Sequence, residues 1–543
     1  MKKMVLSVIA SVMLCLTARG QDQPVKKDTT ALPRLEIPEI TIVGKKAITL
    51  PFARKGEIYD VNIYEAPRAD TSVLEQRPAM SLPIGSLPRY DEPLIPWHLS
   101  AEGSFGTFST GHFRGYLDYK GRRWGIYGNG GYNSTRGHVD GAAGNSFQME
   151  ANAHSIISTD NEILKSFRVS GGFQLLHEKY GLYGIKSSGV NRSRTNVVFD
   201  TKLNSLDRES GALDFKLRAD IWSLSDNSRS SDSSASSVSP EIAIAYTTKF
   251  DAVQLMSNVS YSSSSLSYDH PAQSPSLFKA TAEAKWNMID KLSMQLGAIF
   301  SNGSGSDGAS RSLISPVASV KWELDQDRAL SVWLQPEIRL KSYGELSKIN
   351  PYLIREIAIK PERVPFNLGS TFWYNSEIFS VEVTGGFSTS SNRSITTADS
   401  GKIRFAFAGV NEFTVRANGS IKPAANTDLI FAGVIHPAYE RGKSIQLPMT
   451  PLIQIAARGV LVFDFPLSLF SSIELWSRQN VDLAGKKTIG DRILIGAGAS
   501  TAVIPRTVLS LDIKNLFNQK YEWWSFYEAP GIMVELAAKM NFR

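Results

Sequence analysis

Histidine and carboxylate side chains are the groups of this 543-residue chain that could carry acid–base or metal chemistry. The seven histidines follow no metal-ligand spacing and include no HExxH pair, so the sequence indicates no metal site and no cofactor. His436 with Glu440, or Asp269 with His270, could activate a serine, but such pairs arise by chance in a serine-rich chain. The sequence therefore predicts no catalytic residue and no enzyme activity.

A larger group of charged residues follows a period of two. Between Leu213 and Ile221 every odd-numbered residue is apolar and every even-numbered residue is charged. A β-strand separates such a sequence into an apolar and a charged face, whereas a helix cannot. The alternation recurs from Trp97 onward and ends with apolar residues at every second position from Ile532 to Phe542.

Short and long connections alternate between these predicted strands. Phe250–Asp251 is a short connection, whereas Tyr343–Glu362 and Trp523–Pro530 are long. The run from Ser223 to Ser239, with 10 serines in 17 residues, is also predicted to be a long loop. Outer-membrane barrels have short periplasmic turns and longer extracellular loops. The chain is therefore predicted to be all-β, a transmembrane antiparallel β-barrel of about 22 strands over residues 97–543.

The lumen of such a barrel would be lined by the charged face, because the apolar face meets lipid. A Lys or Arg on the lipid face costs about 2–4 kcal/mol at the bilayer midplane, which fixes the orientation of each strand. Both signs of charge occur, so we expect ion pairs along the wall as well as ligand contacts. The lumen-facing candidates are Asp214, Lys216, Arg218, Asp220, Glu337, Arg339, Lys341, Glu474 and Arg478.

Four aromatic residues lie in the predicted external loop before the last strand: Trp523, Trp524, Phe526 and Tyr527. Aromatic rings favour the membrane interface, so they could belong to a rim girdle. They could also pack within the loop or grip a ligand. A nucleic-acid partner is not expected, because Lys and Arg alternate with Asp and Glu and form no basic patch.

The first 96 residues lack the alternation. Residues 1–20 have the pattern of a signal peptide, with two lysines before an apolar run and a small-residue cleavage site. A lipoprotein signal at Cys15 is the rival interpretation, but Leu14 is too large for the position before the cysteine. Residues 21–96 hold 10 of the 25 prolines, so we expect an extended, irregular segment. One short β-like run interrupts it, comprising Glu39, Ile40, Thr41, Ile42, Val43 and Gly44.

Two motifs resemble those of TonB-dependent outer-membrane receptors. Asn350-Pro351-Tyr352-Leu353, followed by Lys360-Pro361-Glu362-Arg363, is similar to their NP-x-L-x-PE region, and residues 515–522 resemble their NLF-[DN]-x-x-YE signature. The resemblance implies a 22-stranded barrel in the outer membrane of a Gram-negative-type bacterium, surrounded by outer-membrane lipid and inserted by the barrel-assembly machinery. Residues 39–44 are similar to the TonB box, which adds as an edge strand to its partner, so the resemblance also implies TonB as a partner.

The plug domain of that family has no obvious counterpart, because only about 50 residues separate the TonB-box-like run from the first strand. Residues 45–96 could thread into the lumen as a partial stopper, or the chain could be a plugless relative. The leading hypothesis is a receptor-like barrel that binds or imports an external small-molecule or polymer ligand. The alternatives are a passive porin-like channel and a barrel with a structural or adhesive role.

Overall fold

The computed structural model describes residues 97–542, apart from residues 122, 160–165, 185–188, 207–210, 228–231, 268–273, 290, 355–357, 400–401 and 503. The predicted signal peptide, the proline-rich extension and the TonB-box-like run lie outside the described residues. No helix in the described part is long and apolar enough to cross a bilayer.

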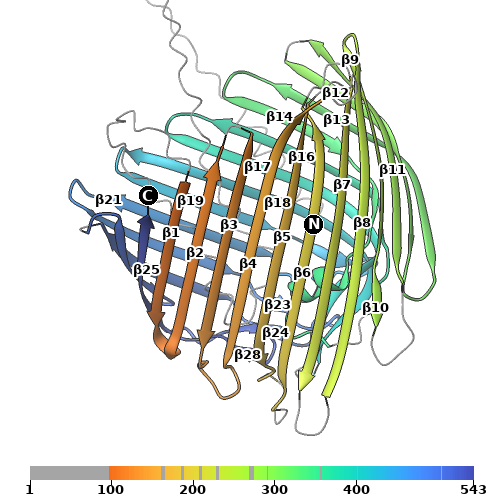
Figure 1. Cartoon of the computed structure of the whole chain (residues 1–543). Coiled ribbons are helices and arrows are strands. Elements are labelled where there is room, and N and C mark those ends of the chain that lie inside the picture. The colour runs from red at the N-terminus through yellow and green to blue at the C-terminus, as the bar shows by residue number, and fades with distance from the viewer. Residues whose placement is uncertain are drawn as a thin grey trace, which may run out of the picture. The chain divides into compact units, whose positions relative to one another are not determined.

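Antiparallel strands account for most of the described chain (Figure 1). The first half contains β1 (Trp97–Gly106), η2 (Thr107–Ser109), β2 (Thr110–Lys120), β3 (Trp124–Thr135), β4 (Gly144–Ser158), β5 (Ser166–Gly181), β6 (Asn191–Ser205), β7 (Ala212–Asn227), β8 (Asp232–Phe250), β9 (Val253–Ser263), β10 (Ser265–Ser267), β11 (Ser276–Ile289), β12 (Leu292–Ser304) and β13 (Ser310–Glu323). The second half contains β14 (Arg328–Leu334), β15 (Glu337–Arg339), α2 (Tyr343–Ile349), β16 (Glu362–Asn375), β17 (Phe379–Asp399), β18 (Lys402–Ala424), β19 (Thr427–Ile435), β20 (Ala438–Glu440), β21 (Ile453–Val462), β22 (Leu467–Trp476), β23 (Gln479–Asn480), β24 (Thr488–Ile489), β25 (Arg492–Thr501), β26 (Thr507–Lys514), β27 (Glu522–Trp524), β28 (Tyr527–Glu528) and β29 (Met533–Phe542).

One closed sheet forms the barrel. Each long strand pairs with its neighbours in sequence, and β1 pairs with β29 in a register that runs from Leu99 opposite Phe542 to Gly106 opposite Glu535. Figure 1 shows the C-terminal end beside β1. The sheet contains 25 strands, of which β10, β15 and β20 continue β9, β14 and β19 after a break. The barrel wall therefore has 22 strands when each interrupted strand is counted once, and we call each of these a stave. This confirms the predicted fold and strand number.

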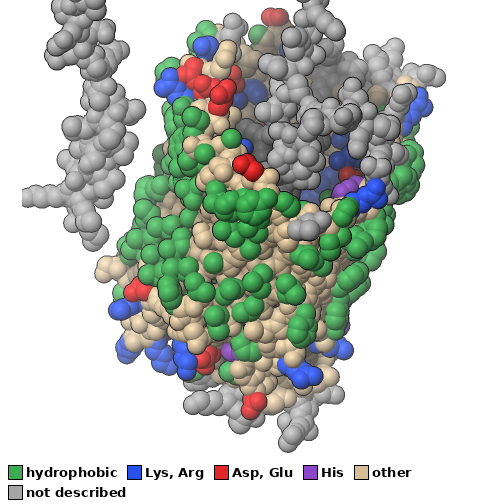
Figure 2. All heavy atoms as spheres, turned by 90° about the vertical axis from the view of Figure 1, so that its left-hand side faces the viewer, with side chains coloured by type: hydrophobic (Ala, Val, Ile, Leu, Met, Phe, Trp, Pro, Cys, Tyr) green, Lys and Arg blue, Asp and Glu red, His purple; other side chains and the backbone are tan. Residues whose placement is uncertain are grey.

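The outer surface of the barrel is apolar. Phe105, Ile314 and Leu536 are each more than 60% exposed, although they belong to paired strands of the sheet. On β7, Leu217 and Ile221 are exposed while Asp220 between them is buried, as the period of two requires. Figure 2 shows hydrophobic side chains over the middle of one face and charged side chains gathered toward its two ends. This surface matches the apolar band of a membrane barrel.

The serine-rich run is not the long loop that its composition predicted. Strand β7 continues to Asn227 and β8 begins at Asp232, so most of the run from Ser223 to Ser239 is paired in the sheet. Serine has a low intrinsic strand preference, but cross-strand contacts override it here. On the inner wall, the Ser239 hydroxyl donates to the hydroxyl of Ser264 at 2.8 Å.

Candidate functional site

The connection between β14 and β16 first continues the barrel wall through β15 and then enters the lumen. The pairing of β13 with β14 ends at Leu334, and β15 then pairs with β16 alone among the described strands. Ile338 of β15 is completely buried and packs with Leu277 and Leu313. These two residues lie on the inner wall, because their neighbour Ile314 is 78% exposed on the outside. We refer to residues 335–354, which begin with this inward turn, as the crossbar.

Helix α2 forms the middle of the crossbar. A capping box fixes its first turn: the Ser342 hydroxyl accepts a hydrogen bond from the Glu345 amide, and the Glu345 carboxylate accepts one from the Ser342 amide. Tyr343 is fully buried and stacks on Trp222 of β7 with ring centroids 6.2 Å apart. A side chain at Gly344 would have its Cβ 3.1 Å from the Asp220 carboxylate, so the helix lies tightly against this wall.

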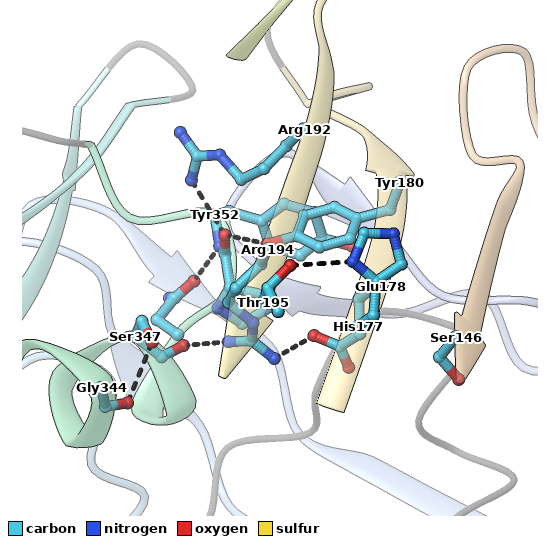
Figure 3. A network of polar contacts seen from close by, with 12 residues as sticks. Ser146, His177, Glu178, Tyr180, Arg192, Arg194, Thr195, Gly344, Ser347 and Tyr352 are labelled. Carbon is cyan, nitrogen blue, oxygen red and sulfur yellow. Dashed lines mark hydrogen bonds and ion pairs between the residues drawn. The ribbon is translucent and has the colours of Figure 1, made fainter. Parts of the chain in front are cut away.

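Two arginines of β6 hold the end of the crossbar (Figure 3), and we call Arg192 and Arg194 the arginine clamp. Arg192 donates to the carbonyl oxygens of Pro351, at 2.9 Å, and of Leu353. It also makes a bidentate ion pair with Asp226, at 2.6 and 2.8 Å. Both side chains of the clamp are no more than 3% exposed, so these charge-assisted bonds are shielded from water.

The second arginine binds the C-terminal turn of α2. Arg194 donates to the Ser347 carbonyl oxygen at 2.6 Å and forms an ion pair with Glu178 of β5. The carbonyls at the end of a helix lack intrahelical partners and carry partial negative charge, which favours a cation at this position. In Figure 3 the guanidinium of Arg194 lies between Ser347 and Glu178. Arg194 thus joins the crossbar to the barrel wall.

The same segment also contacts the other side of the barrel. Leu353 forms a parallel bridge with Ile403 of β18, and the Ile354 amide donates to the Ile403 carbonyl at 2.9 Å. Strand β6 is the sixth stave and β18 the sixteenth in the strand order of the 22-stave barrel. Since nine staves lie between them on one side and eleven on the other, the crossbar connects strands from opposite sides of the mouth.

A second loop packs against the crossbar. The hairpin of β27 and β28 places Tyr527, which is fully buried, in a stacked arrangement with Tyr352 of the crossbar, with ring centroids 3.6 Å apart. Tyr180 and Tyr183 contact these rings edge-on. These loops and the adjoining strand ends share one buried apolar cluster. The barrel mouth on the long-loop side is therefore occupied by packed protein.

The predicted external-loop aromatics divide between two environments. Trp523, Trp524 and Tyr527 are at most 9% exposed and belong to the mouth cluster, whereas Phe526 is 39% exposed at the hairpin tip. The guanidinium carbon of Arg492 lies 4.4 Å from the centre of the Trp523 ring and 3.8 Å from that of Trp476. This cation–π contact fixes the hairpin to the wall.

The two motifs of the sequence supply the turns of this closed mouth. The Asn350 side chain accepts a hydrogen bond from the Tyr352 amide at 2.8 Å, which positions the Tyr352 ring. Asn515 and Asn518 have positive φ angles of 50°, a conformation that asparagine tolerates better than most residues. The Asn518 side chain accepts from the Ile532 amide at 2.9 Å and thereby closes the loop before β29.

The predicted lumen-facing residues are spread around the barrel. Lys216 pairs with Glu241 at 2.7 Å, and Glu337 accepts from both Lys279 and Arg339. Asp214 accepts from Asn204 and Asp220 from Asn196, each at 3.1 Å, and Arg218 lies opposite Asp200 and Glu241 in the sheet register. Lys341 lines a small cavity with Arg339, Glu474 belongs to β22, and the Arg478 amide bonds Asp491. Only Glu337 and Arg339 are paired with each other.

The arginine clamp was missed in the sequence. Its arginines alternate with serine and threonine in Asn191-Arg192-Ser193-Arg194-Thr195, so no apolar partner residues mark the strand face. The histidine pair considered for catalysis takes another arrangement: His436 bonds Glu412 at 2.9 Å, and Glu412 also accepts from Ser388 at 2.8 Å. Asp269 and His270 lie outside the described residues. Within the described ranges, no group of three or more His, Cys, Asp or Glu side chains is placed to hold a metal.

Solved structures with the same architecture are transporters and receptors by name. The FrpB iron transporter from Neisseria meningitidis superposes with a TM-score of 0.65 at 12% identity, over 82% of this chain and 81% of that one. The chain has the barrel fold of the TonB-dependent outer-membrane receptors. The copper transporter OprC gives a TM-score of 0.63 and the ferric yersiniabactin uptake receptor FyuA from Yersinia pestis 0.61, each at 12% identity and over 82% of this chain and 80% of the other.

No family model and no curated protein matches the sequence. The TonB-dependent-receptor barrel is therefore recognised from its three-dimensional structure. This fold and the apolar outer surface are those of a membrane-spanning β-barrel.

Proposed function

We propose that the protein is a gated receptor and importer, in which an external solute binds at the mouth and passes when the crossbar is displaced. The observation that supports this most directly is that the crossbar contacts strands on opposite sides of the barrel. Arg192 of β6 donates to its Pro351 carbonyl, and its Leu353 forms a bridge with β18. The solved neighbours are named as transporters and uptake receptors, which supports import of a solute in general terms.

The strength of the clamp favours a gate over a passive channel. Arg192 and Arg194 make three hydrogen bonds to crossbar carbonyls. Hydrogen bonds to charged groups contribute about 1.5–3 kcal/mol each, so releasing the crossbar costs several kcal/mol before the aromatic contacts are counted. At such a cost the open state is a minor population, and a solute must bind it more tightly than the closed state to shift the balance. A passive porin would need no such lock.

Single-channel recording in planar bilayers tests the gate. We expect low conductance from the intact protein and a several-fold higher open probability when both clamp arginines are replaced by glutamine. Arg218→Gln is the matched control. Arg218 belongs to β7, and it is not one of the arginines that donate hydrogen bonds to the crossbar carbonyls. A channel that is fully open before any substitution would reject gating and favour the porin-like alternative.

Coupling to TonB is tested separately. We propose that residues 39–44 recruit TonB by strand addition, on the basis of their similarity to the TonB box. The periplasmic domain of TonB should capture the full chain in a pull-down assay, and deletion of residues 39–44 should abolish capture. Capture that survives the deletion contradicts the assignment of the box, and absence of capture from the intact chain contradicts energised import.

The extension between this run and the barrel has its own proposed role. We propose that residues 45–96 act as a partial stopper of the lumen, because they are the only chain available between the box-like run and β1. Deleting residues 45–96 should raise conductance further in the clamp double variant. Equal conductance with and without them would show that the crossbar alone closes the barrel.

A further inference from the structure

A buried arginine beside the β27–β28 hairpin has an incomplete set of hydrogen bonds. Arg492, the first residue of β25, is 2% exposed. Its Nη1 atom donates to the Glu522 carbonyl oxygen at 3.1 Å. Its Nε and Nη2 atoms have no hydrogen-bond partner in the described part of the chain. Buried donors without acceptors are costly, so other contacts must offset this position of the guanidinium.

Aromatic rings provide those contacts, and most of them belong to one segment. The guanidinium carbon lies 5.6 Å from the centre of the Tyr521 ring, in addition to its contacts with Trp476 and Trp523. We call these three rings the aromatic cage. Tyr521, Glu522 and Trp523 are consecutive, whereas Trp476 belongs to β22 of the wall. Movement of the hairpin away from the wall therefore removes two rings and the carbonyl from Arg492 in a single step.

A carboxylate lies within reach of the same arginine. Trp476 and Arg492 are register partners on β22 and β25, and Glu474 is opposite Leu494 in the same register. Residues two apart on a strand share a face, so Glu474 and Arg492 are diagonal neighbours, a separation that long side chains span. Leu494 packs against the mouth cluster, which places Glu474 beside the mouth.

The Glu474 carboxylate is available to accept this arginine. Glu474 is exposed, and no hydrogen bond or ion pair reaches its side chain within the described ranges. Lys514 of β26 is the other cation that acts on it electrostatically, but Lys514 has a contact of its own. Nε and Nη2 form one edge of the Arg492 guanidinium, and a carboxylate can accept from both at once. The ion pair would thus satisfy the two donors that the aromatic cage leaves without acceptors.

We propose that Arg492 is a two-position latch of the mouth. With the hairpin docked it lies in the aromatic cage, and with the hairpin lifted it turns to Glu474 and forms an ion pair on the wall. This pair stabilises the open state, because the hairpin regains its contacts only after Arg492 leaves the carboxylate. The proposal rests on the gated-receptor function and assigns two residues to its regulation.

Glu474 would act in the opposite direction if it were only a distant counter-charge. A counter-charge stabilises the buried cation where it lies, so its loss would favour opening of the hairpin. Loss of an open-state partner instead favours the docked hairpin. The sign of the effect of Glu474→Gln therefore separates the two roles.

Hydrogen–deuterium exchange of the full chain in detergent micelles measures this sign, because the amides of residues 521–528 exchange when the hairpin opens. We expect their exchange to be at least threefold slower in Glu474→Gln than in the parent. Glu474→Asp keeps the carboxylate and should restore most of the parent rate. In an Arg492→Leu background, Glu474→Gln should have no further effect, because the group that it would capture is gone.

Glu241→Gln is the matched control. Glu241 pairs with Lys216 across β7 and β8, so this variant removes the same charge from the lumen wall on staves that do not contact the hairpin through the latch. The amides of residues 521–528 should exchange in this variant as they do in the parent.

Equal or faster exchange in Glu474→Gln overturns the latch, and so does a slowing that persists in the Arg492→Leu background. Either result leaves the gated receptor intact when the clamp double variant has the raised open probability expected above. Slower exchange in Glu474→Gln, in a barrel whose conductance does not respond to the clamp substitutions, would instead support the latch and reject the gated importer.

Discussion

The Tyr352 ring lies stacked on the Tyr527 ring at a centroid separation of 3.6 Å, and the two residues come from different loops of the barrel mouth. Tyr352 belongs to the crossbar, which the arginine clamp attaches to β6, and Tyr527 belongs to the β27–β28 hairpin. Neither loop closes the mouth alone, because each packs on the other in one apolar cluster. This contact predicts that disturbing one ring releases both loops.

Tyr352→Ala should open the mouth. Truncation removes the stacking partner of Tyr527 and leaves a cavity in the cluster, and loss of a buried aromatic ring costs about 3–5 kcal/mol. We expect a higher open probability in single-channel recordings. Tyr527→Phe is the matched control, because the Tyr527 hydroxyl has no hydrogen-bond partner among the described residues. A similar conductance increase in Tyr527→Phe would contradict the assignment of closure to ring stacking.

Alkaline pH should weaken the same contact. Burial raises the pKa of Tyr527 above that of free tyrosine, although the nearby Arg192 acts in the opposite direction. The folded state therefore prefers the neutral phenol, and its contribution to closure is complete below about pH 10 and is lost as the pH rises through the raised pKa. Conductance should stay low up to about pH 10 and increase above it. In Tyr527→Phe this increase should be absent.

Arg192→Lys should weaken the clamp although the charge is kept. A lysine cannot reproduce the bidentate pair with Asp226 while it also bonds two carbonyls. We expect a loss of about 2–4 kcal/mol in crossbar attachment, visible as faster trypsin cleavage at Lys348 in the folded protein. Lys216→Arg on β7, where Lys216 pairs with Glu241, should leave the cleavage rate unchanged. Equal rates in the parent and Arg192→Lys would show that the crossbar is held by its aromatic contacts alone.

Gly344→Ala should displace α2 from the wall. The added Cβ would lie 3.1 Å from one Asp220 carboxylate oxygen and 3.2 Å from the other, which is tighter than most Cβ contacts, and the hydrogen bond from Asn196 resists movement of this carboxylate. The expected result is that the segments packed in the mouth unfold at a lower temperature and that the channel has a higher open probability. Asp220→Ala in the same chain should restore closure by making room. Gly103→Ala is a control for the substitution itself, since nothing lies within 4 Å of a Cβ at that position.

A disulfide between residues 353 and 403 should lock the mouth. Leu353 and Ile403 are bridge partners, so cysteines at both positions can approach each other. The chain has one cysteine, Cys15, which lies in the predicted signal peptide. We expect Leu353→Cys with Ile403→Cys to abolish solute uptake into cells until a reductant is added, whereas Leu353→Cys alone should permit uptake. Uptake through the oxidised double variant would show that solute passes without crossbar movement.

The barrel was predictable from the sequence because its determinants are local. A period of two fixes the lipid face of each strand, as the exposed Leu217 and the buried Asp220 illustrate. Turn residues such as Asp251 mark the end of the barrel that has the short connections. The serine-rich segment misled the prediction, since serine composition indicates a loop while strand pairing is set by the neighbouring chain.

The closed mouth could not be predicted in the same way. Arg192 bonds Pro351 across 159 positions of sequence, and no periodicity reports which loop folds inward. The motif at Asn350 marked the right segment, but only the structure shows that its asparagine positions Tyr352. The TonB-box-like run and the proline-rich extension remain predictions, because they lie outside the described residues.

The pairing of β1 with β29 has a consequence for biogenesis. Until the residues of β29 are delivered, both β1 and β26 present unsatisfied backbone groups, which are ready templates for pairing with another chain. A chain truncated after Lys514 would lose β29 and keep the other 21 strands of the wall, yet it could not satisfy either edge within the hydrocarbon layer. We therefore expect insertion to depend on whether translation has finished, so that ribosome stalling late in the message yields periplasmic aggregates in place of a slightly smaller pore.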